Sequence, residues 1–161
     1  MIKKIYVDMD GVLADFNSRF VELFGHAPSE ARNKFGQHWR TIVDDKHFET
    51  FDLHEGATEL VEFLNSVNKK ADIAILSSSG GFKDHASVQS QKINWLCKNS
   101  INFPAIIVPG RWYKKGFANN QSFLIDDTQD VCDDFVVMDG YVSLHTNANE
   151  TIEKVKSWLS L

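Results

Sequence analysis

The sequence of 161 residues is poor in the features that define several common protein classes. Its two cysteines, Cys97 and Cys132, are too few for a disulfide framework and lack the spacing of metal ligands. No apolar run approaches the roughly 20 residues that a membrane helix needs. The 17 basic residues are outnumbered by 22 acidic ones, which disfavours binding to a long nucleic acid. These absences predict a soluble, cytoplasmic protein.

Short β-branched apolar runs alternate with longer segments of helical periodicity. This alternation is typical of an α/β fold in which helices flank a parallel sheet, as in Rossmann-like domains. Amphipathic stripes predict helices at 57–68 and 87–98, and Asn149 is a candidate cap for a last helix. We predict strands at 4–8, 72–76, 105–108, 123–126 and 141–145.

The segment at about 16–54 is too long for one crossover helix and is rich in aromatic residues. Phe16, Phe20 and Phe24 would share one face of a helix, and Pro28 is typical of a helix start. We therefore predict a single domain, with its core at 1–15 and 55–161 and a small helical insertion between them.

Polar side chains follow three of the predicted strands. In a parallel sheet, ligands bind at the carboxyl ends of the strands. Lys114 and Lys115 precede the fourth strand and supply positive charge. The residues at the strand ends, in chain order, are Asp8, Asp10, Gly11, Ser77, Ser78, Asp126 and Asp127.

If these strands are neighbours, four carboxylates converge, and their repulsion is costly unless a cation is present. Hard oxygen ligands select Mg²⁺, which keeps coordination positions for phosphate oxygens. A lysine and serine hydroxyls suit the other phosphate oxygens. The set therefore predicts a phosphoryl-transfer site with a carboxylate nucleophile.

In this order the motifs resemble those of the haloacid dehalogenase (HAD) superfamily of phosphotransferases. The superfamily pattern is DxDG after an apolar strand, here beginning at Asp8, then a serine or threonine, here Ser77, then a lysine and an acidic pair, here Asp126 and Asp127. Within that superfamily, the longer stretch DMDGVLADF at 8–16 is similar to the signature of the 5'(3')-deoxyribonucleotidases.

The resemblance implies a role for each carboxylate. Asp8 would attack the phosphate and form an aspartyl-phosphate. Asp10 would protonate the leaving ester oxygen and later activate water. Asp8, the backbone carbonyl of Asp10 and Asp126 would hold Mg²⁺, and Asp127 would support the ion through waters.

The resemblance also implies contacts to the phosphoryl group. Ser77 would donate a hydrogen bond to it, and Ser78 is a second candidate contact. Gly11 would permit a tight turn beside the substrate. The third-motif lysine is Lys115 or Lys114, and the spacing slightly favours Lys115.

By the same resemblance, the insertion would be a cap over the site and Phe16 would stack on a nucleobase. Trp39, Phe48 and Phe51 are candidates for further walls of the site. The expected function is a Mg²⁺-dependent phosphomonoesterase for nucleoside monophosphates, in particular deoxyribonucleoside monophosphates. The alternatives are a HAD phosphatase for another small phosphoester, such as a sugar phosphate or a nucleic-acid end, and a non-catalytic binding protein with the same fold.

Overall fold

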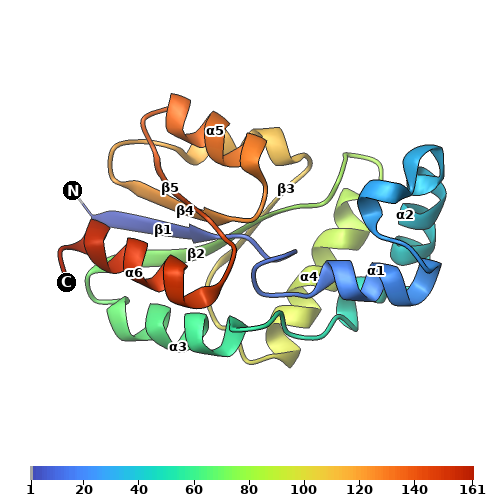
Figure 1. Cartoon of the computed structure of the whole chain (residues 1–161), viewed down its shortest axis with the longest axis horizontal. Coiled ribbons are helices and arrows are strands. Elements are labelled where there is room, and N and C mark those ends of the chain that lie inside the picture. The colour runs from blue at the N-terminus through green and yellow to red at the C-terminus, as the bar shows by residue number, and fades with distance from the viewer. Residues whose placement is uncertain (1) are drawn as a thin grey trace.

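The computed structural model describes residues 2–161 and has a five-stranded parallel sheet at its centre (Figure 1). The strand order is β3-β2-β1-β4-β5, so the first strand lies in the middle. This arrangement confirms the predicted α/β fold, and no strand boundary differs from its predicted position by more than two residues. The strands are β1 (Lys3–Val7), β2 (Ala71–Ser78), β3 (Ala105–Val108), β4 (Ser122–Asp126) and β5 (Tyr141–Leu144).

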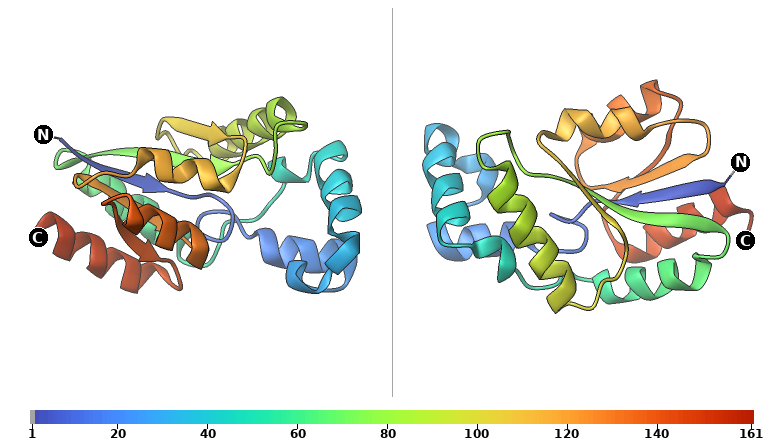
Figure 2. Two further views of the ribbon diagram at one scale, coloured as in Figure 1. Left: turned by 90° about the horizontal axis from the view of Figure 1, so that it is seen from above. Right: turned by 180° about the vertical axis from the view of Figure 1, so that it is seen from behind.

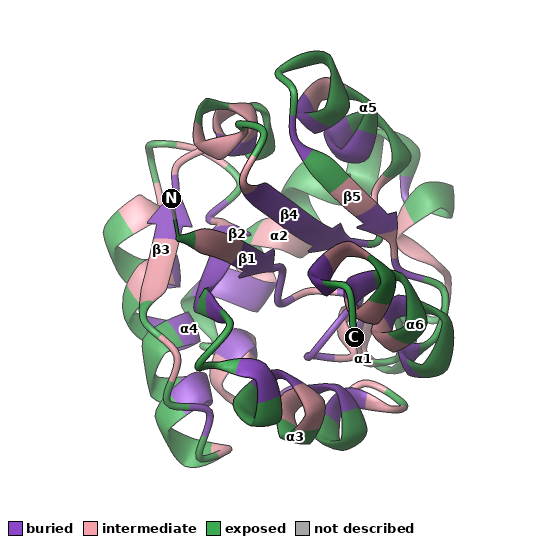
Figure 3. Ribbon diagram, turned by 90° about the vertical axis from the view of Figure 1, so that its left-hand side faces the viewer, coloured by how far each residue is buried: buried purple, intermediate pink, exposed green. Residues whose placement is uncertain are grey.

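Helices cover both faces of the sheet because successive strand residues point to opposite sides. On β1, Ile5 and Val7 join the larger buried cluster with residues of α3, α4 and α6, whereas Tyr6 joins a second cluster with residues of α5 and η4 (Figures 1 and 3). No helix within residues 2–161 has the length and apolar character needed to cross a bilayer. The elements on the two faces are α3 (Ala57–Val67), α4 (His85–Lys98), α5 (Gln129–Val137), α6 (Ala148–Leu159) and the 3-10 stretch η4 (Arg111–Phe117).

The helical segment 16–54 lies beyond the end toward which β1 runs (Figures 1 and 2). Hydrogen bonds tie it to α4: the indole N–H of Trp95 donates to the carbonyl of Phe51 at 2.7 Å, and Nε2 of Gln91 donates to the carbonyl of Val43 at 2.9 Å. The segment contains α1 (Phe16–Phe24), η1 (Pro28–Glu30), η2 (Arg32–Lys34), α2 (Phe35–Asp44) and η3 (His47–Glu49).

Of two expectations about helix starts, one is met by a short helix and one is wrong. Pro28 begins the 3-10 helix η1, which ends at Glu30, and Arg32, with a left-handed φ of 47°, separates η1 from α2. Asn147, rather than Asn149, caps α6. Its backbone is extended as a cap requires, and its Oδ1 accepts from the N–H of Glu150 at 2.9 Å.

Candidate active site

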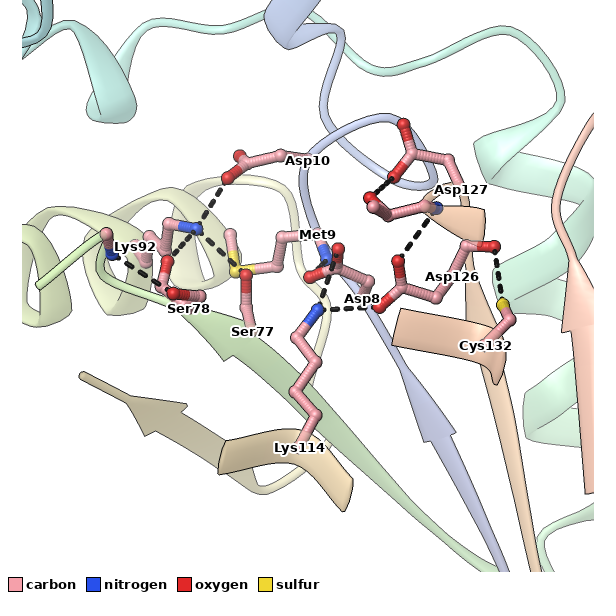
Figure 4. A network of polar contacts seen from close by, with 12 residues as sticks. Asp8, Met9, Asp10, Ser77, Ser78, Lys92, Lys114, Asp126, Asp127 and Cys132 are labelled. Carbon is pink, nitrogen blue, oxygen red and sulfur yellow. Dashed lines mark hydrogen bonds and ion pairs between the residues drawn. The ribbon is translucent and has the colours of Figure 1, made fainter. Parts of the chain in front are cut away.

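The carboxyl ends of three neighbouring strands bring the predicted acidic and serine residues together (Figure 4). Asp8 follows β1, and its backbone N–H donates to the carbonyl of Ile125 on β4 at 2.9 Å. Ser77 lies near the end of β2, Asp126 ends β4, and all three polar residues are buried. In chain order, β2 and β3 lie on one side of β1, and β4 and β5 lie on the other. The central strand therefore ends at a topological switch point, where open α/β sheets bind ligands.

The turn after β1 requires a glycine. Gly11 has a φ of +78°, and a Cβ at this position would overlap the carboxylate of Asp127. The N–H groups of Leu13 and Ala14 both donate to the carbonyl of Met9 at 2.8 Å, which closes the turn. The glycine thus allows the loop that carries the first acidic pair to pack against the second pair.

Lys114 lies between two of the carboxylates, and Lys115 does not. Nζ of Lys114 is 2.9 Å from Oδ2 of Asp8 and 2.7 Å from Oδ2 of Asp126, and the side chain is 2% exposed. Burial alone would lower the pKa of Lys114, but the two carboxylates outweigh burial and raise it. The side chain of Lys115 is 43% exposed, and its Nζ is 3.3 Å from Oδ2 of Asp134 on α5. The geometry therefore favours Lys114 over Lys115 as the third-motif lysine.

The carboxylates of Asp8, Asp126 and Asp127 form a compact group that could hold a metal ion. One oxygen from each lies within 4.8 Å of the others. A donor set made only of carboxylate oxygens suits Mg²⁺. The side chain of Asp10 is outside this group.

The pKa values of this group indicate negative charge that is not fully offset. Burial raises the pKa of Asp126 to about 7, the charge of Asp8 adds to the effect, and Lys114 opposes it. Desolvation also raises the pKa of Asp127 to about 6, again with a contribution from Asp8. A divalent cation among these oxygens would offset the repulsion, so the residues fit the predicted ion.

Asp10 points its side chain away from this group and toward α4 (Figure 4). Its Oδ2 accepts from Nζ of Lys92 at 2.7 Å, while its Oδ1 is buried and has no hydrogen-bond partner within residues 2–161. Lys92 is fully buried and also donates to Oγ of Ser77 and to the carbonyl of Ser78, each at 2.8 Å. Lys92 was not among the predicted site residues, although its place on the apolar face of the predicted helix 87–98 was a signal.

The two predicted serines take different positions. Ser77 is fully buried at the end of β2 and reaches the cavity described below. Ser78 is partly buried, and its Oγ accepts from the N–H of Gly80 at 3.1 Å, so it also shapes the loop after β2. Both serines line the cavity.

A cavity of about 930 Å³ opens over these residues, with the sheet ends on one side and the helical segment 16–54 on the other. The predicted residues Asp8, Asp10 and Asp127 line its polar part. Trp39 packs so closely on Gly80 that a Cβ there would overlap its ring, which joins α2 to the loop after β2. The aromatic residues that line the cavity are Phe16, Phe35, Trp39, Phe82, Trp112 and Tyr113.

Several solved structures, some of them described as HAD-type proteins, are similar to this chain. A hydrolase from Streptococcus pneumoniae gives a TM-score of 0.54 at 15% identity, over 99% of each chain. A protein described as a haloacid dehalogenase-like hydrolase, from Burkholderia xenovorans, gives 0.54 at 11% identity, again over 99% of each chain. A HAD family enzyme from Bacteroides thetaiotaomicron, in complex with magnesium and inorganic phosphate, gives 0.51 at 17% identity and covers 89% of this chain and 93% of its own. No family model and no curated protein sequence matches the chain. The likenesses show that the chain has the HAD fold.

Proposed function

We propose that this protein is a Mg²⁺-dependent phosphomonoesterase of the HAD superfamily. Its substrates would be nucleoside monophosphates, in particular deoxyribonucleoside monophosphates, and its intermediate an aspartyl-phosphate. The observation that carries the proposal is the arrangement of Asp8, Asp10 and Ser77 along one aromatic-walled cavity, with Lys114 bound to Asp8. The fold shared with a haloacid dehalogenase-like hydrolase and with a HAD family enzyme in complex with magnesium and inorganic phosphate supports it.

In the first step, a carboxylate oxygen of Asp8 attacks phosphorus, and the bond from phosphorus to the leaving oxygen breaks. Lys114 pairs with Oδ2 of Asp8 and orients the nucleophile. Asp10, whose Oδ1 has no partner within residues 2–161, donates the proton that the leaving oxygen needs. Ser77 donates its hydroxyl proton to a phosphoryl oxygen, and Ser78 is a second contact.

In the second step, Asp10 accepts a proton from water, and the water oxygen attacks phosphorus. The bond from phosphorus to Asp8 breaks, inorganic phosphate leaves, and Asp10 is again protonated for the next turnover. Mg²⁺, when bound by Asp8, Asp126 and the backbone carbonyl of Asp10 with support from Asp127, would offset the charge on the phosphoryl group. The helical segment 16–54 acts as a cap that limits the access of bulk water.

The aromatic walls support a nucleobase as the recognised part of the leaving group. The ring of Phe16 packs against Phe48 and Phe51, with centroid distances of 6.4 and 5.7 Å, and Trp39 packs on Phe48 at 5.4 Å. Rings held in this way provide rigid stacking surfaces at little entropic cost. Phe16 also occupies the position that the deoxyribonucleotidase resemblance assigns to base stacking. The net charge of -5 disfavours a long polynucleotide as the substrate.

The test is the release of inorganic phosphate from ribo- and deoxyribonucleoside 5'- and 3'-monophosphates, sugar phosphates and p-nitrophenyl phosphate, with Mg²⁺ or with EDTA. Asp8→Asn is expected to abolish turnover while the fold remains. Asp72→Asn is the matched control, because Asp72 is exposed near the start of β2, at the opposite end of the sheet, and activity should be retained.

Each of the other outcomes would overturn one part of the proposal. Hydrolysis of sugar phosphates alone would overturn the nucleotide substrate and keep the phosphatase. Full activity of Asp8→Asn would overturn the mechanism. No Mg²⁺-dependent hydrolysis of any ester would favour the binding-protein alternative.

A further inference from the structure

Lys92 has no free proton with which to bind a phosphate. An ammonium group has three protons. Those of Lys92 are used by Oδ2 of Asp10 at 2.7 Å, Oγ of Ser77 at 2.8 Å and the carbonyl of Ser78 at 2.8 Å. Lys114, by contrast, contacts two carboxylates, which leaves one proton for a substrate oxygen. The two buried lysines of the site therefore have different roles.

The contact with Lys92 fixes one oxygen of Asp10 and leaves the other available. Oδ2 is held by the ammonium, while Oδ1 is buried and lacks a partner within the described chain. Because Asp10 lines the cavity, the carboxyl group is held in one orientation beside the space a substrate would occupy. A proton donor that must meet a leaving oxygen gains rate from such fixed geometry.

The same ammonium determines how Ser77 can bond. Lys92 can only donate, so Oγ of Ser77 must accept the bond at 2.8 Å. The hydroxyl proton of Ser77 is then available to an acceptor on its other side. Phosphoryl oxygens are such acceptors, so the contact matches Ser77 to an anionic ligand.

The burial of Lys92 is costly unless it serves such a network. The side chain is fully buried, and one carboxylate and two uncharged oxygens compensate its charge. Replacing a buried ion pair with apolar side chains is often neutral or stabilising, so stability alone does not explain a lysine here. Its Nζ also lies 5.1 Å from the ring centre of Phe48, which packs on Phe16.

We propose that Lys92 is a positioning residue that orients Asp10 for proton transfer to the leaving oxygen and directs the Ser77 hydroxyl toward the phosphoryl group. This role rests on the proposed phosphatase function.

The test compares Lys92→Met with Lys98→Met, a control at the exposed end of the same helix, on two esters. The leaving oxygen of a deoxynucleoside 5'-monophosphate needs a proton, whereas p-nitrophenyl phosphate releases a stable phenolate. We compare kcat/KM, which reports only the steps up to departure of the leaving group. A well-placed general acid is worth about 10²- to 10⁴-fold. We therefore expect Lys92→Met to lose at least about tenfold more on the nucleotide than on the aryl ester, and Lys98→Met to behave as wild type.

A double-mutant cycle tests whether Lys92 acts through Asp10. In an Asp10→Asn background, Lys92→Met should lower kcat/KM for the nucleotide only by the factor that it costs on p-nitrophenyl phosphate in the wild-type background, because no acid remains to be oriented and only the contact with Ser77 is lost. Thermal unfolding of each variant confirms folding, and Lys92→Gln replaces Lys92→Met if the latter does not fold.

Equal losses of Lys92→Met on both esters, or full additivity with Asp10→Asn, would overturn the role of Lys92 and leave the phosphatase intact. A wild-type protein that hydrolyses neither ester would overturn the proposed function, and this role with it.

Discussion

Replacing Lys114 with methionine should destabilise the protein strongly in the absence of metal. Nζ of Lys114 lies 2.9 and 2.7 Å from the carboxylates of Asp8 and Asp126. At an effective dielectric constant of about 20, each contact is worth about 6 kcal/mol before the cost of desolvation is subtracted. Removing one partner of a buried ion pair leaves an uncompensated charge and costs about 3–5 kcal/mol. We expect Lys114→Met to lose that much free energy of unfolding at pH 8.

The loss should depend on pH in a defined direction. Burial and Asp8 raise the pKa of Asp126 to about 7, and Lys114 opposes them. Without Lys114 the pKa of Asp126 rises further, so the variant relieves its repulsion by binding a proton that the wild type has released. The difference between variant and wild type should therefore be smaller at pH 6 than at pH 8.5.

The assay is urea unfolding in EDTA, followed by circular dichroism. Lys115→Met is the matched control, because the exposed contact of Lys115 with Asp134 is worth less than about 1 kcal/mol. Millimolar Mg²⁺ should restore part of the stability of Lys114→Met. A loss below about 1 kcal/mol for Lys114→Met, or equal losses for both variants, would refute the assignment of Lys114 as the counter-charge of the acidic group.

Three further predictions concern the same site. Burial raises the pKa of Asp126 to about 7 and that of Asp127 to about 6, so their ionisation costs stability as pH rises from their ordinary pKa of 3.8 toward these values. Mg²⁺ should therefore raise Tm more at pH 8 than at pH 5, and equal shifts would contradict the metal site. Gly11→Ala should lower the free energy of unfolding by about 2 kcal/mol or more, because φ is +78° and the new Cβ would overlap Asp127. Gly36→Ala on α2, where the new Cβ has open space, should be neutral or stabilising. Urea unfolding of both variants checks this contrast. Phe16→Ala should lower kcat/KM for nucleotides by several-fold more than for p-nitrophenyl phosphate, since only the former has a base to stack, and equal losses would make Phe16 a packing residue.

The sheet could be predicted closely because each strand is a short apolar run that ends at a polar or turn-forming residue. Asp8 follows β1, Asp126 ends β4, and Pro109 follows β3, so the sequence itself marks the ends. The same residues predicted the site, since the carboxyl ends of parallel strands meet at one edge. Sequence patterns marked helix starts less well, because a cap depends on the backbone angle at one residue, as at Asn147.

The choice between Lys114 and Lys115 could not be made from the sequence, because both lie in the 3-10 stretch Arg111–Phe117. In a 3-10 helix, adjacent side chains point about 120° apart, so two neighbouring lysines face different surroundings. Only the packing of η4 against the sheet and α5 determines which lysine faces Asp8 and which faces Asp134. A spacing measured along the chain carries no information about that rotation.

Lys92, in contrast, could have been found from the sequence. It follows Val88 by four residues and precedes Trp95 by three, and both neighbours are fully buried, so it lies on the face of α4 that points into the core. A lysine on such a face is costly unless an acid compensates it. An ionisable residue within an apolar stripe thus indicates a buried acidic partner, but the sequence does not say which acid it is. The structure identifies the partner as Asp10, because α4 follows β2 and β2 pairs with β1.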